Sequence, residues 1–399
     1  MNIVFASHTE IGGTFVVGSH HLAREFARLG HRVAHLGPPI SAAHFVRIGR
    51  PDVKRRFALW ARGGEVDGDG VLNYVGLSPL PWRLALNLGP AGWNLYARTV
   101  PSMRRVLKRA GFWPVDVLLV DQPQFAGLEG LLRPRLLVYR ATDLYGEMMN
   151  SALVDDAEHR IARAADLLVG TSEPVLSHLR AFASAPTLLL ENGVEFDRFA
   201  AETSIPSEYR TIPAPRAVYA GAMDERFDTG QIEALAEAGG VNIVLIGPVT
   251  DGVSGALASR KNVFLLGPRS YESLPAYLQH AQVGLLPLTS HPANEGRSPM
   301  KLFEYGAAGL PVVATSTQEL SRRALPFVVL AKDAAAFTEG VAGLLQGADR
   351  RAALGAAARA ISRSYGWRER AATLARTVER MATGTLEQRA AISGSGINC

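Results

Sequence analysis

Short apolar runs alternate with stretches in which apolar residues recur every three to four positions, along nearly the whole chain. Such runs are typical of buried parallel strands, and such periodic stretches are typical of amphipathic helices. In the first half the pattern predicts strands at 2–6, 32–36, 72–76, 117–121, 135–139, 167–170 and 187–190, and helices at 14–29, 151–165 and 174–183. In the second half it predicts strands at 216–220, 242–246, 262–266, 282–286, 311–314 and 326–330, and helices at 230–238, 271–280, 299–308, 333–346, 349–364 and 368–381. Strands that alternate with helices in this way predict an α/β protein with parallel sheets.

The length of the chain allows two domains, since it has 399 residues and a domain takes about 150. The stretch 201–215 holds three prolines and no clear periodicity, so we expect a linker there. We therefore predict two Rossmann-like domains facing a cleft, an N-terminal one at 1–200 and a C-terminal one at 201–383. Residues 384–399 are expected to be disordered. The segment 38–70, rich in Pro, Gly and Arg, gives no clear element.

Positive charge is concentrated in one region. The chain has 42 Lys and Arg against 37 Asp and Glu, a net charge of +5. Residues 46–112 alone hold twelve basic and four acidic residues, which is +8, and four of the five Trp fall at or beside this stretch. Its longest uncharged piece, 84–97, has 14 residues, whereas a spanning helix needs about 20. The region is therefore expected to lie on a membrane and not to cross it.

Within that region, residues 82–109 combine apolar and aromatic side chains with cations, as an interfacial helix does. Gly89-Pro90 should break the stretch into two short pieces. The alternative is an ordinary core helix with a solvated basic face. The apolar set is Trp82, Leu84, Leu86, Leu88, Trp93, Leu95 and Tyr96, and the cations are Arg83, Arg98, Arg104, Arg105, Lys108 and Arg109.

The strongest local signal for chemistry is the segment 298–313. Pro299 is placed to open a helix, and the free amides of a first helical turn favour a phosphate. Lys301 adds a positive charge near the same spot, and Glu304, one turn further on, could accept two hydroxyls of a ribose. The alternative is a plain amphipathic helix with a solvated Lys and Glu.

The loop after the first strand is a second candidate. Gly12 and Gly13 permit close approach of a ligand or of the other domain. The loop lacks the dinucleotide pattern G-x-G-x-x-G, so NAD binding is poorly supported. His8 could serve as a base or a ligand contact, or it could merely cap or pack.

A third candidate, Asp143, follows the strand expected at 135–139. An acid at the carboxyl end of such a strand points toward the ligand crevice of an α/β fold. Alternatively, Asp143 caps the helix that follows. No phosphate-binding P-loop, recurring metal spacing or nucleic-acid recognition motif is present, and the only Cys is the last residue. We therefore expect no metal, no cofactor and no nucleic acid.

Several of these motifs resemble those of GT-B glycosyltransferases over nearly the whole chain. The segment 191–199 is similar to their junction into the C-terminal domain, and 271–278 and 283–287 are similar to the helix and strand before the donor site. Trp367 resembles the tryptophan that begins their closing C-terminal helix, so the resemblance implies that this helix crosses back to the N-terminal domain.

A narrower resemblance is to the xanthan-biosynthesis glucuronosyltransferase family, whose members are inverting and membrane-associated. The segment 140–143 is similar to its R-A-S-D segment, which implies that Asp143 is the general base, and Ser7-His8 matches the start of its first loop. The segment 298–301 is similar to its diphosphate-binding S-S-M-K, which implies donor contacts from Ser298, Met300 and Lys301. Gly221 and Met223 match its nucleotide-contacting G-S-M turn. Glu304, Leu288 and Pro268-Arg269 depart from that family's residues, so UDP-glucuronate is one possible donor among UDP-sugars.

Taken together, the resemblance implies a glycosyltransferase with a nucleotide-sugar donor and a glycan or polyprenyl-diphosphate-linked acceptor. The retaining pattern E-x7-E would need an acid at Gly296, which favours inversion. We expect a cytoplasmic protein held peripherally on the anionic inner face of the cell membrane. A sugar-nucleotide 2-epimerase of the same fold and a non-catalytic sugar-binding relative remain alternatives.

Overall fold

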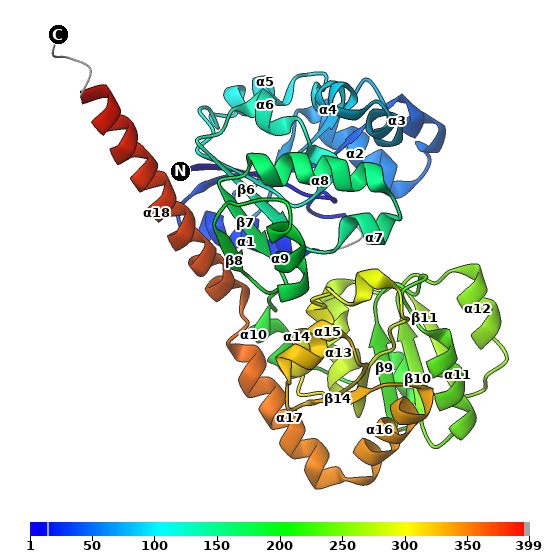
Figure 1. Cartoon of the computed structure of the whole chain (residues 1–399). Helices are drawn as coiled ribbons and strands as arrows, with labels where there is room; N and C mark the ends of the chain where they lie inside the picture. Colours follow the sequence, from blue (N-terminus) through cyan, green and yellow to red (C-terminus); the bar gives the residue numbers. More distant parts are fainter. Residues whose placement is uncertain (14–15, 395–399) are drawn as a thin grey trace. The chain divides into compact units, whose positions relative to one another are not determined.

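The computed structural model describes residues 1–13 and 16–394, with side chains up to residue 383. The chain divides into two compact units, and each has helices around a parallel sheet (Figure 1). The predicted α/β class with two Rossmann-like domains is thereby confirmed. Among the described residues, no helix combines the length and the hydropathy that a bilayer span requires.

The first unit comprises residues 1–191 and 367–399. Its sheet has the order β3-β4-β2-β1-β5-β6-β7-β8, and all neighbours are parallel except β3 and β4. The strands are β1 (Asn2–Ala6), β2 (Arg32–Ile40), β3 (Glu65–Val66), β4 (Leu72–Leu77), β5 (Val117–Val120), β6 (Leu136–Ala141), β7 (Leu167–Gly170) and β8 (Thr187–Leu189). The helices are α1 (Gly18–Arg28), α2 (Pro51–Arg62), α3 (Trp82–Asn87), α4 (Gly89–Ala97), α5 (Met103–Arg109), α6 (Leu128–Leu132), α7 (Tyr145–Met149), α8 (Ala152–Ala164), α9 (Glu173–Arg180) and α18 (Trp367–Gly394), with 3-10 turns η1 (Ala42–Arg47) and η2 (Pro123–Phe125).

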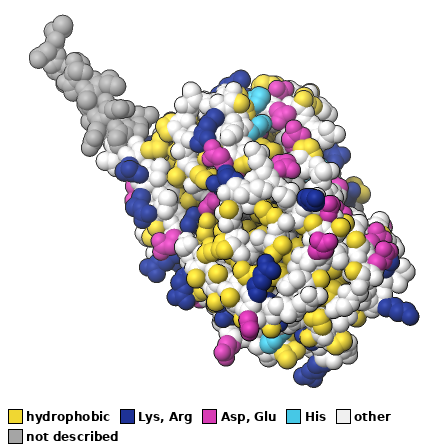
Figure 2. Space-filling view, turned by 60° about the horizontal axis from the view of Figure 1, so that its bottom comes forward, with side chains coloured by type: hydrophobic (Ala, Val, Ile, Leu, Met, Phe, Trp, Pro, Cys, Tyr) yellow, Lys and Arg dark blue, Asp and Glu magenta, His cyan; other side chains and the backbone are white. Residues whose placement is uncertain are grey.

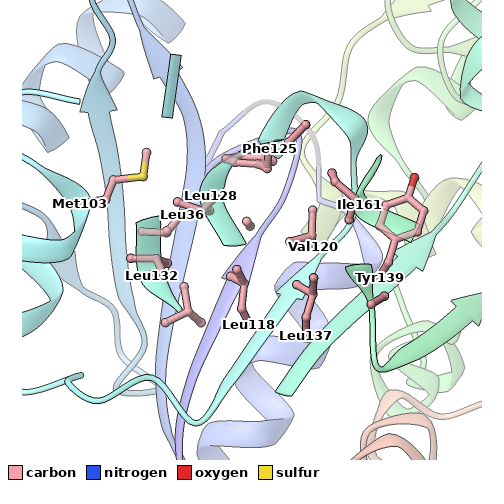
Figure 3. Close-up of a cluster of buried hydrophobic side chains, with 14 of the residues drawn as sticks. Leu36, Met103, Leu118, Val120, Phe125, Leu128, Leu132, Leu137, Tyr139 and Ile161 are labelled. Carbon is pink, nitrogen blue, oxygen red and sulfur yellow. The ribbon is translucent and has the colours of Figure 1, made fainter. Parts of the chain in front are cut away.

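The core of the first unit lies between the sheet and the helices that cover it. Figure 3 shows Leu118, Val120 and Leu137 on the strands, facing side chains from α5, α6 and α8. Because these strands are buried, their apolar runs are nearly continuous, as expected for a parallel sheet. That continuity is why their positions could be predicted from the sequence.

The second unit comprises residues 192–366. Its six strands are all parallel, in the order β11-β10-β9-β12-β13-β14. The strands are β9 (Arg216–Ala220), β10 (Asn242–Ile246), β11 (Val263–Gly267), β12 (Val283–Leu286), β13 (Val312–Thr315) and β14 (Val328–Ala331). The helices are α10 (Phe196–Ala200), α11 (Thr229–Ala238), α12 (Asp251–Leu257), α13 (Leu274–Gln279), α14 (Met300–Ala307), α15 (Gln318–Arg323), α16 (Ala334–Gln346) and α17 (Ala348–Arg363), with 3-10 turns η3 (Ser207–Arg210), η4 (Tyr271–Ser273) and η5 (Pro292–Asn294).

The boundaries of the two units differ from the expected ones at residues 200 and 383. Helix α10 packs on α13 and α14, so it belongs to the second unit. The expected linker 201–215 is also part of that unit, because Tyr209 is buried in its core and donates its hydroxyl to the Tyr277 carbonyl at 3.0 Å. At the other end, α18 packs on α1 and belongs to the first unit (Figure 1).

Two segments of the first unit contain helix that was not predicted from the sequence. Disorder was expected from residue 384, but α18 continues to Gly394, and residues 395–399 lie outside the described part of the chain. The unassigned segment 38–70 contains α2, which begins at Pro51 and ends at Gly63 in the left-handed conformation, φ +73°. Proline at the start and glycine just past the end are standard helix limits.

Candidate functional site

The second unit has the strand order 3-2-1-4-5-6 that binds nucleotides in doubly wound folds. Such a sheet binds ligands outside the carboxyl ends of its strands, where the strand order reverses. Here the reversal lies between β9 and β12. Gly221 follows β9 directly, and its amide donates to the Ile246 carbonyl at 2.7 Å. Gly221, predicted as a nucleotide contact, therefore lies at the place where topology predicts a ligand.

Lys301 reaches this same turn from the first turn of α14. Its ammonium lies 5.3 Å from the centre of the Tyr219 ring. A Cβ placed on Gly221 would overlap the Cε and Nζ atoms of Lys301. Glycine is thus required for the lysine to lie against the backbone, and the two predicted residues form one site.

Burial shifts the pKa values of Lys301 and of its neighbour Glu304. Loss of hydration lowers the pKa of the half-buried Lys301 to about 7; the charge of Arg297 acts in the same direction, and Glu304 opposes it. Glu304 is itself buried. Burial raises the pKa of its carboxyl to about 7, while Lys301 and the Tyr271 hydroxyl lower it. Burial therefore moves the pKa values of Lys301 and Glu304 toward one another from opposite directions.

Ser298 is fixed just before α14. Its carbonyl accepts a hydrogen bond from Asn192 Nδ2 at 2.8 Å, and its hydroxyl oxygen accepts one from Arg323 Nη2 at 2.7 Å. Pro299 is the N-cap of α14 and has no amide hydrogen, so the free amides begin at Met300. Met300 is half-buried at this end of the helix. Ser298, Met300, Lys301 and Glu304 thus lie together around one helix start.

Met223 does not share this arrangement. Its side chain is buried in the core beside Tyr219 and Phe227. Its amide donates to the Pro248 carbonyl at 2.9 Å, and its carbonyl accepts from Thr250 at 3.3 Å. Met223, which was predicted to contact a nucleotide, therefore packs in the core and forms backbone hydrogen bonds within its own unit.

Sequence reasoning missed a third basic residue near this turn. Arg226 follows Gly221 by five positions and forms a two-point ion pair with Asp224, at 3.0 and 2.5 Å. The positive charges of Arg297 and Arg226 both lower the pKa of Lys301. The five-residue spacing of Gly221 and Arg226 could be read from the sequence. The three-dimensional structure was needed to show that Arg226 lies near enough to Lys301 to affect its pKa.

The first unit holds the candidate base. Asp143 follows β6, is half-buried and accepts a hydrogen bond from the Thr142 hydroxyl at 3.1 Å. The N-cap of the next helix, α7, is Leu144, and that helix has no side-chain cap. Asp143 therefore does not act as the helix cap that was its alternative role.

His8 lies at the end of β1, near Asp143. Its side chain is largely exposed, yet the surrounding protein removes enough water to lower the pKa of the imidazole. The carboxylate of Asp143 raises that pKa, and the charge of Arg140 lowers it again. His8 is thus neutral near pH 7, in the form that accepts a proton.

A buried ion pair supports this region. Arg140, on β6, donates to Asp121 Oδ2 at 3.1 Å, and both side chains are almost fully buried. Burial raises the pKa of Asp121 to about 6, although Arg140 lowers it. Tyr145 bridges the two loops, since it donates to the Asp121 carbonyl at 2.5 Å and its hydroxyl lies 2.7 Å from that of Thr142. The strand ends that carry Asp121 and Asp143 are therefore tied together.

The first loop is held in place by residues far away in the sequence. Asn73 Nδ2 donates to the Ile11 carbonyl at 2.9 Å, and Arg55 Nη2 donates to the same oxygen at 2.7 Å. Gly12 has φ +79°, which other residues rarely adopt, and a Cβ there would overlap the Arg55 guanidinium. At the next position, a Cβ on Gly13 would come close to Glu10. The two glycines therefore allow a tight, anchored turn.

One group of side chains has a composition that could bind a metal. Ligand atoms of Asp155, Glu158 and His178 lie within 4.8 Å of one another. However, Glu158 already accepts from the Tyr139 hydroxyl at 2.6 Å and pairs with His178 Nε2 at 3.0 Å. In the described residues Glu158 and His178 are thus engaged with one another and with Tyr139, and the absence of a metal remains a prediction.

Charge on the visible surface is mixed. Figure 2 shows a face on which Lys and Arg side chains are interspersed with Asp and Glu. A nucleic-acid-binding surface has a block or stripe of one sign. This face therefore gives no support to nucleic-acid binding.

Comparison with known proteins adds a sequence similarity in the second unit and a fold. Residues 230–376 match the family model described as glycosyl transferase-like. A protein of Bacillus subtilis (strain 168) named as a teichuronic acid biosynthesis glycosyltransferase, TuaH, is 26% identical over 229 residues. That alignment covers 52% of this chain and 57% of that protein, so the chain spans little more than half of its curated relative.

Solved structures are similar over almost the whole chain. Sucrose-phosphate synthase from Thermosynechococcus elongatus superposes with a TM-score of 0.73 and 16% identity, over 96% of this chain and 99% of that one. HepE of Anabaena, in complex with UDP and glucose, superposes with a TM-score of 0.68 and 15% identity, over 95% of this chain and 99% of that one. At such identities the likeness shows the fold alone. The chain therefore has the two-domain GT-B fold, and its segment 230–376 is glycosyl transferase-like in sequence.

Proposed function

We propose that the protein is a glycosyltransferase that moves a sugar from a UDP-sugar to a glycan or lipid-linked acceptor, with inversion at the anomeric carbon. The observation that carries the proposal is the ammonium of Lys301 lying against Gly221 at the reversal of the strand order. A cation beside helix amides is suited to a diphosphate. A solved neighbour, HepE, was crystallised with UDP and with UDP-glucose, which supports the choice of nucleotide.

In the proposed reaction an acceptor hydroxyl attacks the anomeric carbon directly. The new bond from the acceptor oxygen forms as the bond to the diphosphate breaks, and the bonding electrons leave with UDP. Asp143 takes the proton of the acceptor hydroxyl as general base. Lys301 and the amides that begin α14 stabilise the charge on the departing diphosphate, so no metal is needed for this step.

The position of Glu295 supports inversion. A retaining pattern would need an acid at Gly296, and Glu295 is the neighbouring carboxylate. Its Oε2 accepts from the Gln318 amide at 2.7 Å, so it is engaged at the start of α15. A carboxylate held there caps a helix and is not presented to a donor.

The donor is best identified by thermal shift with a panel of UDP- and GDP-sugars, UDP-glucuronate among them. A ligand that binds only the folded protein raises the melting temperature by mass action. We expect UDP-sugars to raise it and GDP-sugars to leave it unchanged. Release of UDP that depends on added acceptor then distinguishes a transferase from an epimerase. If no nucleotide sugar shifts the melting temperature, the proposed activity is wrong.

We further propose that the first unit contacts an anionic membrane, with the protein on the cytoplasmic side. The surface differs from the one expected from sequence, because Trp93, Tyr96 and Leu86 are buried in the core. The predicted break at Gly89-Pro90 is confirmed by the limits of α3 and α4. Among the exposed apolar side chains of the described first unit are Phe45, Val46, Ile48, Leu84, Leu88, Leu95 and Val100, which we call the apolar edge.

Contacts through α2 connect two members of the apolar edge, Phe45 and Val100. The ring of Phe45 lies 4.5 Å from that of Phe57, which in turn contacts Trp60. Trp60 Nε1 donates to the Val100 carbonyl at 2.6 Å. Exposed cations lie on α3 (Arg83), directly after α4 (Arg98) and on α5 (Arg104, Arg105, Lys108 and Arg109) of the same unit. Apolar side chains beside cations are the composition of an interfacial surface.

Sedimentation with anionic liposomes tests this contact. Each cation near the surface adds about 1 kcal/mol, so charge reversal at Arg104, Arg105, Lys108 and Arg109 should release the protein, and added salt should weaken binding. Leu84→Glu with Leu88→Glu should also release it. Ile205→Glu changes an equally exposed residue of the second unit and should not. Wild-type protein that stays in the supernatant at low salt would contradict the proposal.

A further inference from the structure

Arg323 is the last residue of α15, a helix for which no role was expected. Its side chain is almost fully buried, with only 2% exposed. Its Nη2 atom donates to the hydroxyl oxygen of Ser298 at 2.7 Å, across 25 positions of sequence. Ser298 is itself buried, immediately before the helix that presents Lys301. A buried guanidinium therefore touches a residue of the proposed donor site.

The position of Arg323 is fixed by more than this one bond. Its Nε atom donates to Glu319 Oε1 at 2.8 Å, and its guanidinium lies 5.5 Å from the centre of the Phe303 ring. Burial would raise the pKa of Glu319, but bonds from Arg322 and Arg323 outweigh it and lower that pKa. Glu319 is therefore charged, and a buried carboxylate needs its cation to stay in place. Glu319 thus balances one of the two positive charges of Arg322 and Arg323 and holds the Arg323 guanidinium in place.

The direction of this hydrogen bond determines what Ser298 can do. Arginine only donates, so the Ser298 oxygen must be the acceptor. A serine hydroxyl has one proton, and that proton is then directed away from Arg323. Its carbonyl is also occupied, by Asn192. No acceptor for the Ser298 proton is found among the described side chains and backbone atoms, and a cation bound to the oxygen makes it a better donor.

We infer that Arg323 is a positioning residue of the donor site: it holds the Ser298 hydroxyl so that its proton points to the diphosphate of the nucleotide sugar. This inference rests on the proposed function. In this arrangement the Ser298 hydroxyl donates a hydrogen bond to the diphosphate, and α15 contributes to substrate binding. Arg323 itself does not touch the substrate.

The test compares Arg323→Gln with Arg322→Gln. Arg322 bonds the same carboxylate, at 2.8 and 2.9 Å, but it is exposed and does not reach Ser298. The Kd values for UDP and for uridine are measured by calorimetry on the full chain. Loss of one hydrogen bond to a charged group should weaken UDP binding by about 10- to 150-fold. Uridine, which lacks phosphate, should bind equally to wild type and to both variants.

Ser298→Ala provides the second arm. If Arg323 acts through the serine, Ser298→Ala should show the same loss for UDP, and the double variant should lose no more than either single one. Should Arg323→Gln fold poorly, Arg323→Lys keeps a cation beside Glu319 but lacks the fork that serves both partners. It should lose UDP affinity at a nearly unchanged melting temperature.

Three results would overturn the inference: additive losses in the double variant, an equal loss in Arg322→Gln, or a parallel loss of uridine binding. Each of these results would mean that α15 stabilises the fold and does not orient the Ser298 hydroxyl. Failure of the proposed function looks different, because the wild type itself would then bind no UDP, and both proposals would fall together.

Discussion

Replacing Lys301 by alanine tests the proposed donor site most directly. In the free protein the ammonium lies against Gly221 and over the Tyr219 ring. A diphosphate at this turn would form a charge-assisted contact with it, and losing such a contact costs about 1.5–3 kcal/mol. At about 1.4 kcal/mol for each factor of ten, the Kd for a UDP-sugar should rise by about 10- to 150-fold.

The fold should survive this change. Lys301→Ala removes a cation whose pKa burial already lowers to about 7. Its partner Glu304 would lose the charge that lowers its own pKa, so that pKa should rise further above about 7. The buried carboxyl then stays protonated at neutral pH and no unpaired charge remains. We therefore expect a small change in melting temperature.

Calorimetry with UDP-glucose and steady-state kinetics provide the measurement. Lys332→Ala, which removes an exposed lysine of the same unit, is the matched control and should change neither Kd nor turnover. An unchanged Michaelis constant for the donor together with unchanged turnover in Lys301→Ala would refute the diphosphate assignment. A large fall in melting temperature would refute the electrostatic argument for Glu304.

Three further predictions follow from the same geometry. Binding of UDP-glucose should weaken as the pH rises above about 7, because free Lys301 then loses the proton that attracts the diphosphate; a Kd independent of pH, measured by calorimetry, contradicts this. Asp143→Asn should keep donor affinity but lose about 10²- to 10⁴-fold in transfer rate; if transfer stays near the wild-type rate, His8 becomes the candidate base. Gly221→Ala should displace Lys301 and weaken UDP-glucose binding, whereas Gly252→Ala, where a Cβ meets open space, should not; equal affinities for the two variants would show that Lys301 does not need the Gly221 backbone.

The sequence predicts the central strands well because burial on both faces makes each one a nearly continuous apolar run. The predicted strands 2–6, 216–220 and 242–246 coincide with β1, β9 and β10. The short helix α15 was missed, since its six residues show too few turns for a period to be read. Helix α12 was missed for the same reason, with seven residues.

Side-chain environment was harder to predict than secondary structure. Trp93 and Tyr96 suggested a membrane face, because an amphipathic pattern identifies an apolar side but not what covers it. In the structure both rings are buried in the first unit, and Trp82 packs against Tyr96. Only three-dimensional packing separates these core aromatics from the exposed leucines on the same helices.

Part of the candidate site could be predicted because it depends on local geometry. Lys301 and Glu304 are one helical turn apart, so their coupling was visible in the sequence. The contact of Arg323 with Ser298 spans 25 positions and depends on where α15 lies. The spacing of Arg323 and Ser298 in the sequence therefore does not indicate that these two residues are in contact.

The charges around the Gly221 turn limit how strongly the cations of the proposed donor site repel one another. Arg226 is paired with Asp224, and Lys301 is coupled to Glu304, so these cations do not repel one another at full strength. Arg297 adds a positive charge that acts on both Lys301 and Asp224. Nearby carboxylates therefore balance most of this positive charge, which limits the cost of holding the cations together away from water. A diphosphate would supply the missing negative charge and favour the charged form of Lys301, so binding near pH 7 should be accompanied by proton uptake.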